Sequence, residues 1–214
     1  MIASSKITSK ENILLLILLI FYTVGTVGIL LPEYREFMLR FSAMNLFVSM
    51  IILILSRKNH VLPFWRMLAI CFVVGIVVEL IGTRTGLLFG NYAYGANLGP
   101  KVFGVPWIIG VNWGILVVCS ASWVNRLQAH LIIKALLAAL IMTALDLIIE
   151  PVAIDSDFWT WKSAKIPIYN YICWFVIAFP LQWLNFKLKA VESNKVANGL
   201  LVIMTLFFLI LNIW

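Results

Sequence analysis

VELIGTRTGLLFGNYAYGANLGPKVFGVPW, residues 78–107, interrupts a chain that otherwise alternates long apolar runs with short basic loops. The stretch contains a glutamate, an arginine, two tyrosines, two asparagines and six glycines. A second polar and aromatic stretch occupies residues 146–174, again beside apolar runs. These two stretches break the apolar pattern, so they determine where the chain leaves the apolar environment.

The composition is typical of an integral membrane protein. Of the 214 residues, 63% are hydrophobic and 12% are charged, whereas soluble domains are about 45–50% apolar and about 25% charged. A helix needs about 20 apolar residues to span a bilayer. We therefore expect a single transmembrane domain over residues 1–214, with no room for a soluble domain.

Seven apolar runs are long enough to predict about seven transmembrane helices, which gives an all-α, polytopic membrane helix bundle. The expected spans are residues 12–31, 37–55, 64–82, 106–124, 131–149, 168–187 and 196–214.

The lysines and arginines predict that the N-terminus is cytoplasmic. Ten of them fall on the N-terminal side of these spans and six on the other, and cytoplasmic loops are the ones enriched in Lys and Arg. This asymmetry explains the net charge of +7, so we expect no nucleic-acid partner. We expect the protein in the inner membrane of a bacterium.

The same topology brings the two unusual stretches together. The loops after the third and fifth predicted spans both lie at the non-cytoplasmic face, where residues 78–107 and 146–174 meet. Four helix ends converge there, and we expect them to enclose a polar, aromatic pocket.

Three carboxylates near these helix ends are the candidate catalytic residues: Asp146, Glu79 and Glu150. Asp146 and Glu150 are four residues apart and therefore share one face of a helix. Ionisable groups inside a membrane are costly unless paired or solvated, and they mark functional sites. The alternative is structural, with Glu79 or Asp146 paired to Arg84 to tie helices together. A carboxyl group in an apolar pocket keeps its proton at neutral pH and can donate it.

Aromatic and amide side chains surround these carboxylates in the predicted pocket. The faces of Trp and Tyr rings stabilise a transient cation. Acids with aromatic walls suit the protonation of an alkene and the protection of the resulting carbocation. The candidate substrate-binding residues are Arg84, Asn91, Tyr92, Tyr94, Asn112, Trp113, Trp159, Trp161, Asn170, Tyr171 and Trp174.

The remaining motifs argue against other kinds of site. The glycines and prolines of residues 82–106 predict a structured loop that lines a cavity, without a nucleotide-binding glycine pattern. His60 and His130 fall in loops at the cytoplasmic side, and the three cysteines fall singly in different apolar runs. We therefore expect no metal site.

Residues in both stretches resemble the integral-membrane carotenoid biosynthesis proteins. The pattern E-x-x-G-x-x-T-G-x-x-F-G-x-Y-x-Y occupies residues 79–94, followed by G-V-P at 104–106 and by Trp113. The second stretch has Asp146, then E-P-V-A at 150–153, W-x-W at 159–161 and I-P-x-x-N-Y-x-x-W at 166–174. The resemblance covers about residues 78–175.

This family includes carotenoid 1,2-hydratases, and the resemblance implies cofactor-free hydration of a terminal double bond. The implied partners are a lycopene- or gamma-carotene-like carotenoid, water and membrane lipid. Asp146 or Glu79 would protonate C2 of an acyclic end group, and water would add to the cation at C1 to give a tertiary alcohol. The water would be oriented by the other carboxylate, by Asn112 or by Asn170. The cation would be shielded by Tyr92, Trp113 and Trp174.

Other functions remain open from the sequence. A carotenoid cyclase begins with the same protonation, but an alkene instead of water captures the cation. A non-catalytic carotenoid or lipid binder, or a small transporter, belongs to a different class. The sequence does not determine the oligomeric state.

Overall fold

The computed structural model describes residues 2–163 and 165–214, which form eight α-helices and four short β-strands. The helices are α1 (Ile2–Leu30), α2 (Pro32–Leu39), α3 (Ser42–Ser56), α4 (Leu62–Thr85), α5 (Ile108–Val124), α6 (Leu131–Asp155), α7 (Ile168–Lys187) and α8 (Lys195–Ile213). The strands are β1 (Tyr92–Tyr94), β2 (Lys101–Val102), β3 (Val105–Pro106) and β4 (Trp159–Trp161).

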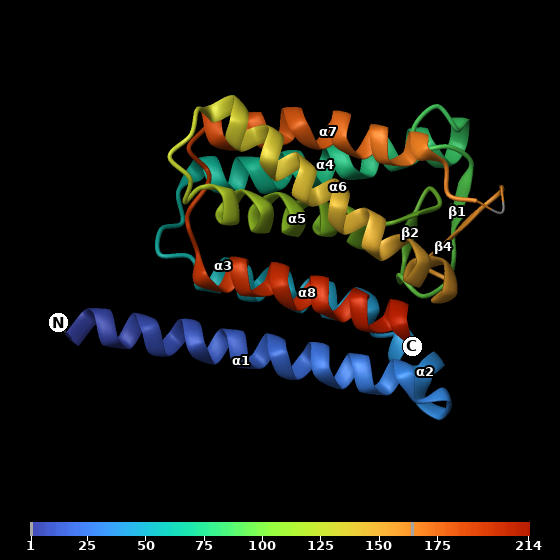
Figure 1. Cartoon of the computed structure of the whole chain (residues 1–214), viewed down its shortest axis with the longest axis horizontal. Coiled ribbons are helices and arrows are strands. Elements are labelled where there is room, and N and C mark those ends of the chain that lie inside the picture. Colours follow the sequence, from blue (N-terminus) through green and yellow to red (C-terminus); the bar gives the residue numbers. More distant parts are fainter. Residues whose placement is uncertain (1, 164) are drawn as a thin grey trace.

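The helices form a bundle around α5. In Figure 1, α1 lies along one side, α3 and α8 lie next to it, and α4, α6 and α7 lie on the far side with α5. Helix α5 contacts α3, α4, α6, α7 and α8, and most of its residues are buried. A helix that is apolar all round is expected in such a central position.

Several helices are long and apolar enough to cross a membrane. Among the described residues these are Lys10–Leu30, Leu62–Thr85, Leu131–Asp155 and Lys195–Ile213. The pair α2 and α3 makes a fifth if it is one broken span, and α5 is a shorter apolar helix. A membrane helix bundle is therefore supported, whereas the count of seven spans and the cytoplasmic N-terminus stay predictions.

Each predicted span falls on a helix, and the predicted second span, residues 37–55, covers the end of α2 and most of α3. The chain bends by 59° between α2 and α3. Helix α2 starts with Pro32 in its first turn, where the fixed φ of proline suits a helix start. It also carries several charged residues, and Arg35 forms an ion pair with Asp155 at the end of α6. These charges keep α2 out of line with the apolar α3.

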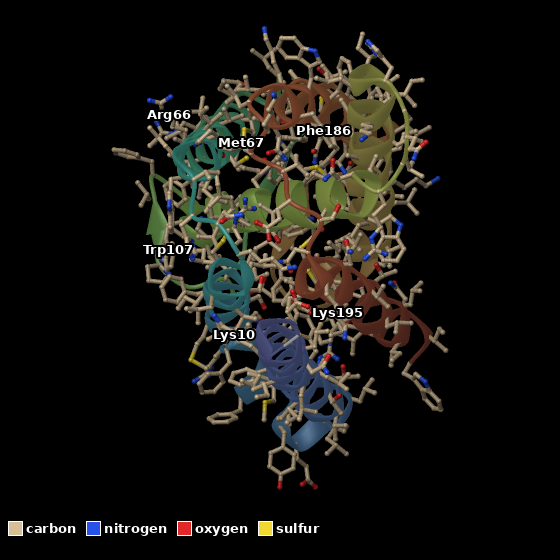
Figure 2. All side chains as sticks on the ribbon, turned by 90° about the vertical axis from the view of Figure 1, so that its left-hand side faces the viewer. Lys10, Arg66, Met67, Trp107, Phe186 and Lys195 are labelled. Atoms are coloured by element: carbon tan, nitrogen blue, oxygen red, sulfur yellow. The ribbon has the colours of Figure 1, made fainter. Side chains whose placement is uncertain are left out.

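The starts of α1, α4 and α8 lie at one end of the bundle, and the strands lie at the other. Figure 2 views the molecule from the end where α1 begins, and Lys10, Arg66 and Lys195 belong to that end although they come from α1, α4 and α8. Helix α2 and the strands lie at the other end (Figure 1). The loop residues 78–107 and 146–174 thus meet at one end, as their predicted topology requires.

A labelling experiment tests the predicted orientation. Cysteines replacing Asn59, between α3 and α4, and Phe103, between β2 and β3, would both be exposed. We expect a membrane-impermeant thiol reagent to label Phe103→Cys in intact cells and Asn59→Cys only after permeabilisation. The unsubstituted chain is the control, because Cys71, Cys119 and Cys173 are buried. Labelling in the reverse order would contradict the cytoplasmic N-terminus.

Candidate active site

A two-stranded ribbon of aromatic residues covers one end of the bundle. Strands β1 and β4 pair in antiparallel fashion, with Tyr92 opposite Trp161 and Tyr94 opposite Trp159. Residues two apart in a strand project from the same face, so all four rings lie on one side of the ribbon. The ring centres are 5.2 Å apart in the first pair and 6.2 Å apart in the second. We name these four residues the aromatic ribbon.

The tyrosines of the aromatic ribbon bind Glu79 of α4. Tyr92 Oη and Tyr94 Oη both donate to Glu79 Oε2, over 2.5 and 2.6 Å, and Trp113 Nε1 lies 3.5 Å from Oε1. Burial, followed by the negative charge of Glu79, raises the pKa of both tyrosines. The phenols therefore stay neutral and remain donors to this buried carboxylate.

Two glycines on α4 make room for the donors to Glu79. Gly75 lies one turn before Glu79, and a Cβ there would lie 2.6 Å from Cδ1 of Trp113. Gly82 lies one turn after it, and a Cβ there would lie 2.7 Å from Oη of Tyr92. Real Cβ atoms do not approach so closely, so both contacts require the absence of a side chain. The spacing of these glycines explains how a phenol and an indole reach one carboxylate on a helix.

The tryptophans of the aromatic ribbon bind Glu150 of α6. Trp159 Nε1 and Trp161 Nε1 both donate to Glu150 Oε2, over 3.0 and 2.9 Å. Asn170 Nδ2 of α7 donates both to Glu150 Oε1 over 3.0 Å and to Asp146 Oδ2 over 2.9 Å. Asn170 therefore bridges the two carboxyl groups. Among the described residues this is the one hydrogen bond that Asp146 accepts, whereas Glu79 and Glu150 each accept three.

A small cavity of about 40 Å³ lies beneath the aromatic ribbon. One water needs about 10–15 Å³ of such space, so the cavity has room for water beside the carboxyl groups. Asn112 lines it, and among the described residues its amide makes no hydrogen bond to the protein. The lining residues are Glu79, Phe89, Tyr92, Tyr94, Ile109, Asn112, Asp146, Ile149, Glu150, Trp159, Trp161, Asn170 and Trp174.

Stacked indoles form one wall of the site. The rings of Trp113 and Trp174 are nearly parallel, at 6°, with centres 4.3 Å apart. Phe89 packs against Trp174, with ring centres 6.2 Å apart, and is itself almost fully buried. Its φ of +64° lies in the left-handed region, which non-glycine residues adopt at a cost and often at functional sites. The chain thus holds an aromatic ring against the cavity in a strained backbone conformation.

The structure brings together all three carboxylates and most of the predicted substrate-binding residues. Trp113 lies behind Trp174 and contacts Glu79 without lining the cavity. Besides Trp113, three predicted residues are absent from the lining: Arg84, Asn91 and Tyr171. Their substrate-binding role stays a prediction that the cavity does not support.

Arg84 does not tie the helices together through a carboxylate. It is exposed at the end of α4, 5.7 Å from the ring centre of Phe103. The two ion pairs found among the described residues involve other arginines. Hydrogen bonds from the aromatic ribbon, instead of Arg84, compensate the buried carboxylates, so the structural alternative based on Arg84 was wrong.

Sequence reasoning missed three lining residues, Phe89, Ile109 and Ile149. Ile109 lies one turn before Asn112, and Ile149 lies one turn after Asp146, so helical spacing from the polar residues was the available signal. Among the described residues, no group of three His, Cys, Asp or Glu side chains is placed to hold a metal ion.

Removal of the phenols tests how Glu79 is held. Tyr92→Phe and Tyr94→Phe should each lower the free energy of unfolding by about 1.5–3 kcal/mol, the typical contribution of a hydrogen bond to a charged group. In the double variant the free energy of unfolding should fall by more than the sum of the two single effects, because Oε2 of Glu79 then has no donor while it remains buried. Unfolding in mixed detergent micelles measures these values.

Tyr34→Phe is the matched control for these variants, because Tyr34 is 52% exposed and surface changes of this kind stay within about 0.5 kcal/mol. Strictly additive effects of the two site variants would show that the phenols do not share Glu79.

Comparisons with known proteins identify the family of this chain. No solved structure matches the chain. The bisanhydrobacterioruberin hydratase of Haloarcula japonica is 31% identical over 106 residues, which are 45% of this chain and 36% of that protein. The chain thus matches about a third of the length of this relative. The family described as "Carotenoid biosynthesis protein" matches residues 38–214, and the chain therefore belongs to the carotenoid biosynthesis protein family.

Proposed function

We propose that the protein adds water to the terminal C1,C2 double bond of an acyclic carotenoid end group and forms a tertiary alcohol. The observation that carries this proposal is the set of three buried carboxyl groups around a cavity with room for water. The name of the archaeal relative, a hydratase, supports the same reaction class. The site would lie near the non-cytoplasmic face of the membrane.

Asp146 is the proposed proton donor. Hydrogen bonds from the protein stabilise the ionised form of a carboxyl group, and Asp146 accepts one whereas Glu150 accepts three. Two adjacent buried carboxyl groups also resist carrying two negative charges. The pair therefore holds one proton, and that proton resides most favourably on Asp146.

The proposed reaction begins with transfer of this proton to C2 of the end group. The electron pair of the double bond forms the new C–H bond and leaves a tertiary cation at C1. The rings of Trp174 and Tyr92 face this cation through their π-electrons, and the negative charge of Glu79 stabilises it at short range.

Water completes the reaction. The free amide of Asn112 and the carboxylate left on Asp146 orient a water molecule in the cavity, and its oxygen bonds to C1. The proton that the water loses returns to the Asp146–Glu150 pair, so the site is restored. The net change is the addition of one water, without a cofactor.

Room for water in the cavity favours hydration over cyclisation. In a cyclase the cation must be kept from water until an alkene captures it, whereas this cavity combines polar lining with an unpaired amide. Reaction in heavy water separates the two outcomes. Both reactions place deuterium at C2, but the mass of an added water appears in the product of hydration alone.

Variants of the carboxylates test the mechanism. In membranes supplied with lycopene, Asp146→Asn should lower turnover by about 100-fold or more, as expected for loss of a general acid. Glu150→Gln should have an effect of similar size, because Glu150 shares the proton with Asp146. Glu79→Gln should have a smaller effect, roughly tenfold, if it acts through charge alone.

The control for these variants is Glu36→Gln, since Glu36 is exposed on α2. The amide variants keep the size of the side chains, so the amount of protein in the membrane should not change. Unchanged product yield in all three site variants would contradict the acid mechanism. Retention of bound pigment with no product in any form, including the unsubstituted chain, would instead indicate a carotenoid binder.

A further inference from the structure

The cavity beneath the aromatic ribbon, which we name the acidic cavity, adjoins a second cavity of about 70 Å³. Ile109, Asn112, Ile149 and Trp159 line both cavities. The acidic cavity alone is too small for a carotenoid end group together with the chain that follows it. A substrate must therefore extend past these four residues.

The second cavity adjoins in turn a groove of about 360 Å³ between α1, α2 and α3. Ser42, Asn45 and Phe207 line both spaces. The walls of the groove are mainly apolar, and Phe21, Val24 and Met44 in them are 40–52% exposed. The groove is thus open at the side of the bundle, where a membrane protein faces lipid chains.

The row of three spaces runs sideways across one end of the bundle. The groove is formed by the last turns of α1, by α2 and by the start of α3, at the same end as the strands (Figure 1). Ser42 Oγ donates to the carbonyl of Leu39 over 2.7 Å, so its hydroxyl presents no free donor at the junction. An apolar chain leaving the acidic cavity meets a mainly apolar path to the bilayer.

We infer that the polyene of the substrate lies in this path, with the end group beside Asp146 and the rest of the chain leaving sideways between α1 and α3. This inference rests on the proposed function, because it assigns the groove to a carotenoid. A carotenoid polyene is apolar, narrow and extended, which fits a row of three adjoining spaces better than one deep pocket. The path gives the substrate access from the bilayer without passage through water.

A bulky side chain at Gly25 tests the path from the α1 side. Gly25 lines the groove, and a Cβ there would lie 3.8 Å from Phe207, so a side chain fits without moving the backbone. Gly25→Phe should fill the groove and lower lycopene hydration by about tenfold or more, as expected when productive binding is blocked. Val27→Phe is the control and should stay within about twofold, since Val27 is 52% exposed on α1 outside the groove.

Met44 provides an independent test from the α3 side. Met44→Trp should lower hydration as Gly25→Phe does, whereas Ile51→Trp, at an exposed position of α3 outside the groove, should not. The amount of each variant in the membrane is measured by immunoblot. If one groove variant does not accumulate, the other still decides the question.

The outcomes separate this inference from the proposed function. Loss of hydration in the groove variants with active controls supports the path. Full activity in the groove variants, while Asp146→Asn is inactive, overturns the path and leaves the groove to bilayer lipid. No hydration of an acyclic carotenoid by the unsubstituted chain overturns the proposed function itself.

Discussion

The burial of three carboxyl groups is the constraint on which the rest of the structure depends. Glu79, Asp146 and Glu150 are each at most 4% exposed, and an ionised group in such a place is stable only if hydrogen-bond donors replace water. The aromatic ribbon supplies four of those donors and Asn170 supplies another. The strand pairing, the glycines of α4 and the loop over the cavity all serve to bring these donors into place.

The chemistry that we propose follows from an unequal distribution of these donors. Glu79 and Glu150 are well compensated, and Asp146 is less so. A site with equal compensation at all three positions would hold three stable anions and have no proton to give. The unequal number of hydrogen bonds is therefore as important as the burial, because it leaves one carboxyl group suited to donate a proton to the substrate.

Much of the fold was predictable because hydrophobic runs report directly on membrane helices. The three carboxylates were predictable as a group because polar residues within such runs are conspicuous. The bend before α3 was missed because Pro32 and the charges of α2 lie next to an apolar run that masks them. The short strands were missed because Y-x-Y and W-x-W are too brief to show a strand period, and their pairing joins segments 67 residues apart in register. The alternative that Arg84 pairs with a carboxylate arose because an arginine is an obvious partner for a carboxylate, whereas neutral phenols and indoles are not.

The hydrogen bonds of the site divide into two sets that share no residue. Every donor to Glu79 comes from residues 92–113, and every donor to Asp146 and Glu150 comes from residues 159–170. Each carboxylate can therefore find its donors within its own part of the chain as that part is synthesised and inserted. The two parts need to meet only through the pairing of β1 with β4 and the packing of the helices. The carboxylates can thus enter the membrane in two separate segments, each already hydrogen-bonded to its own donors, before the cavity between them forms.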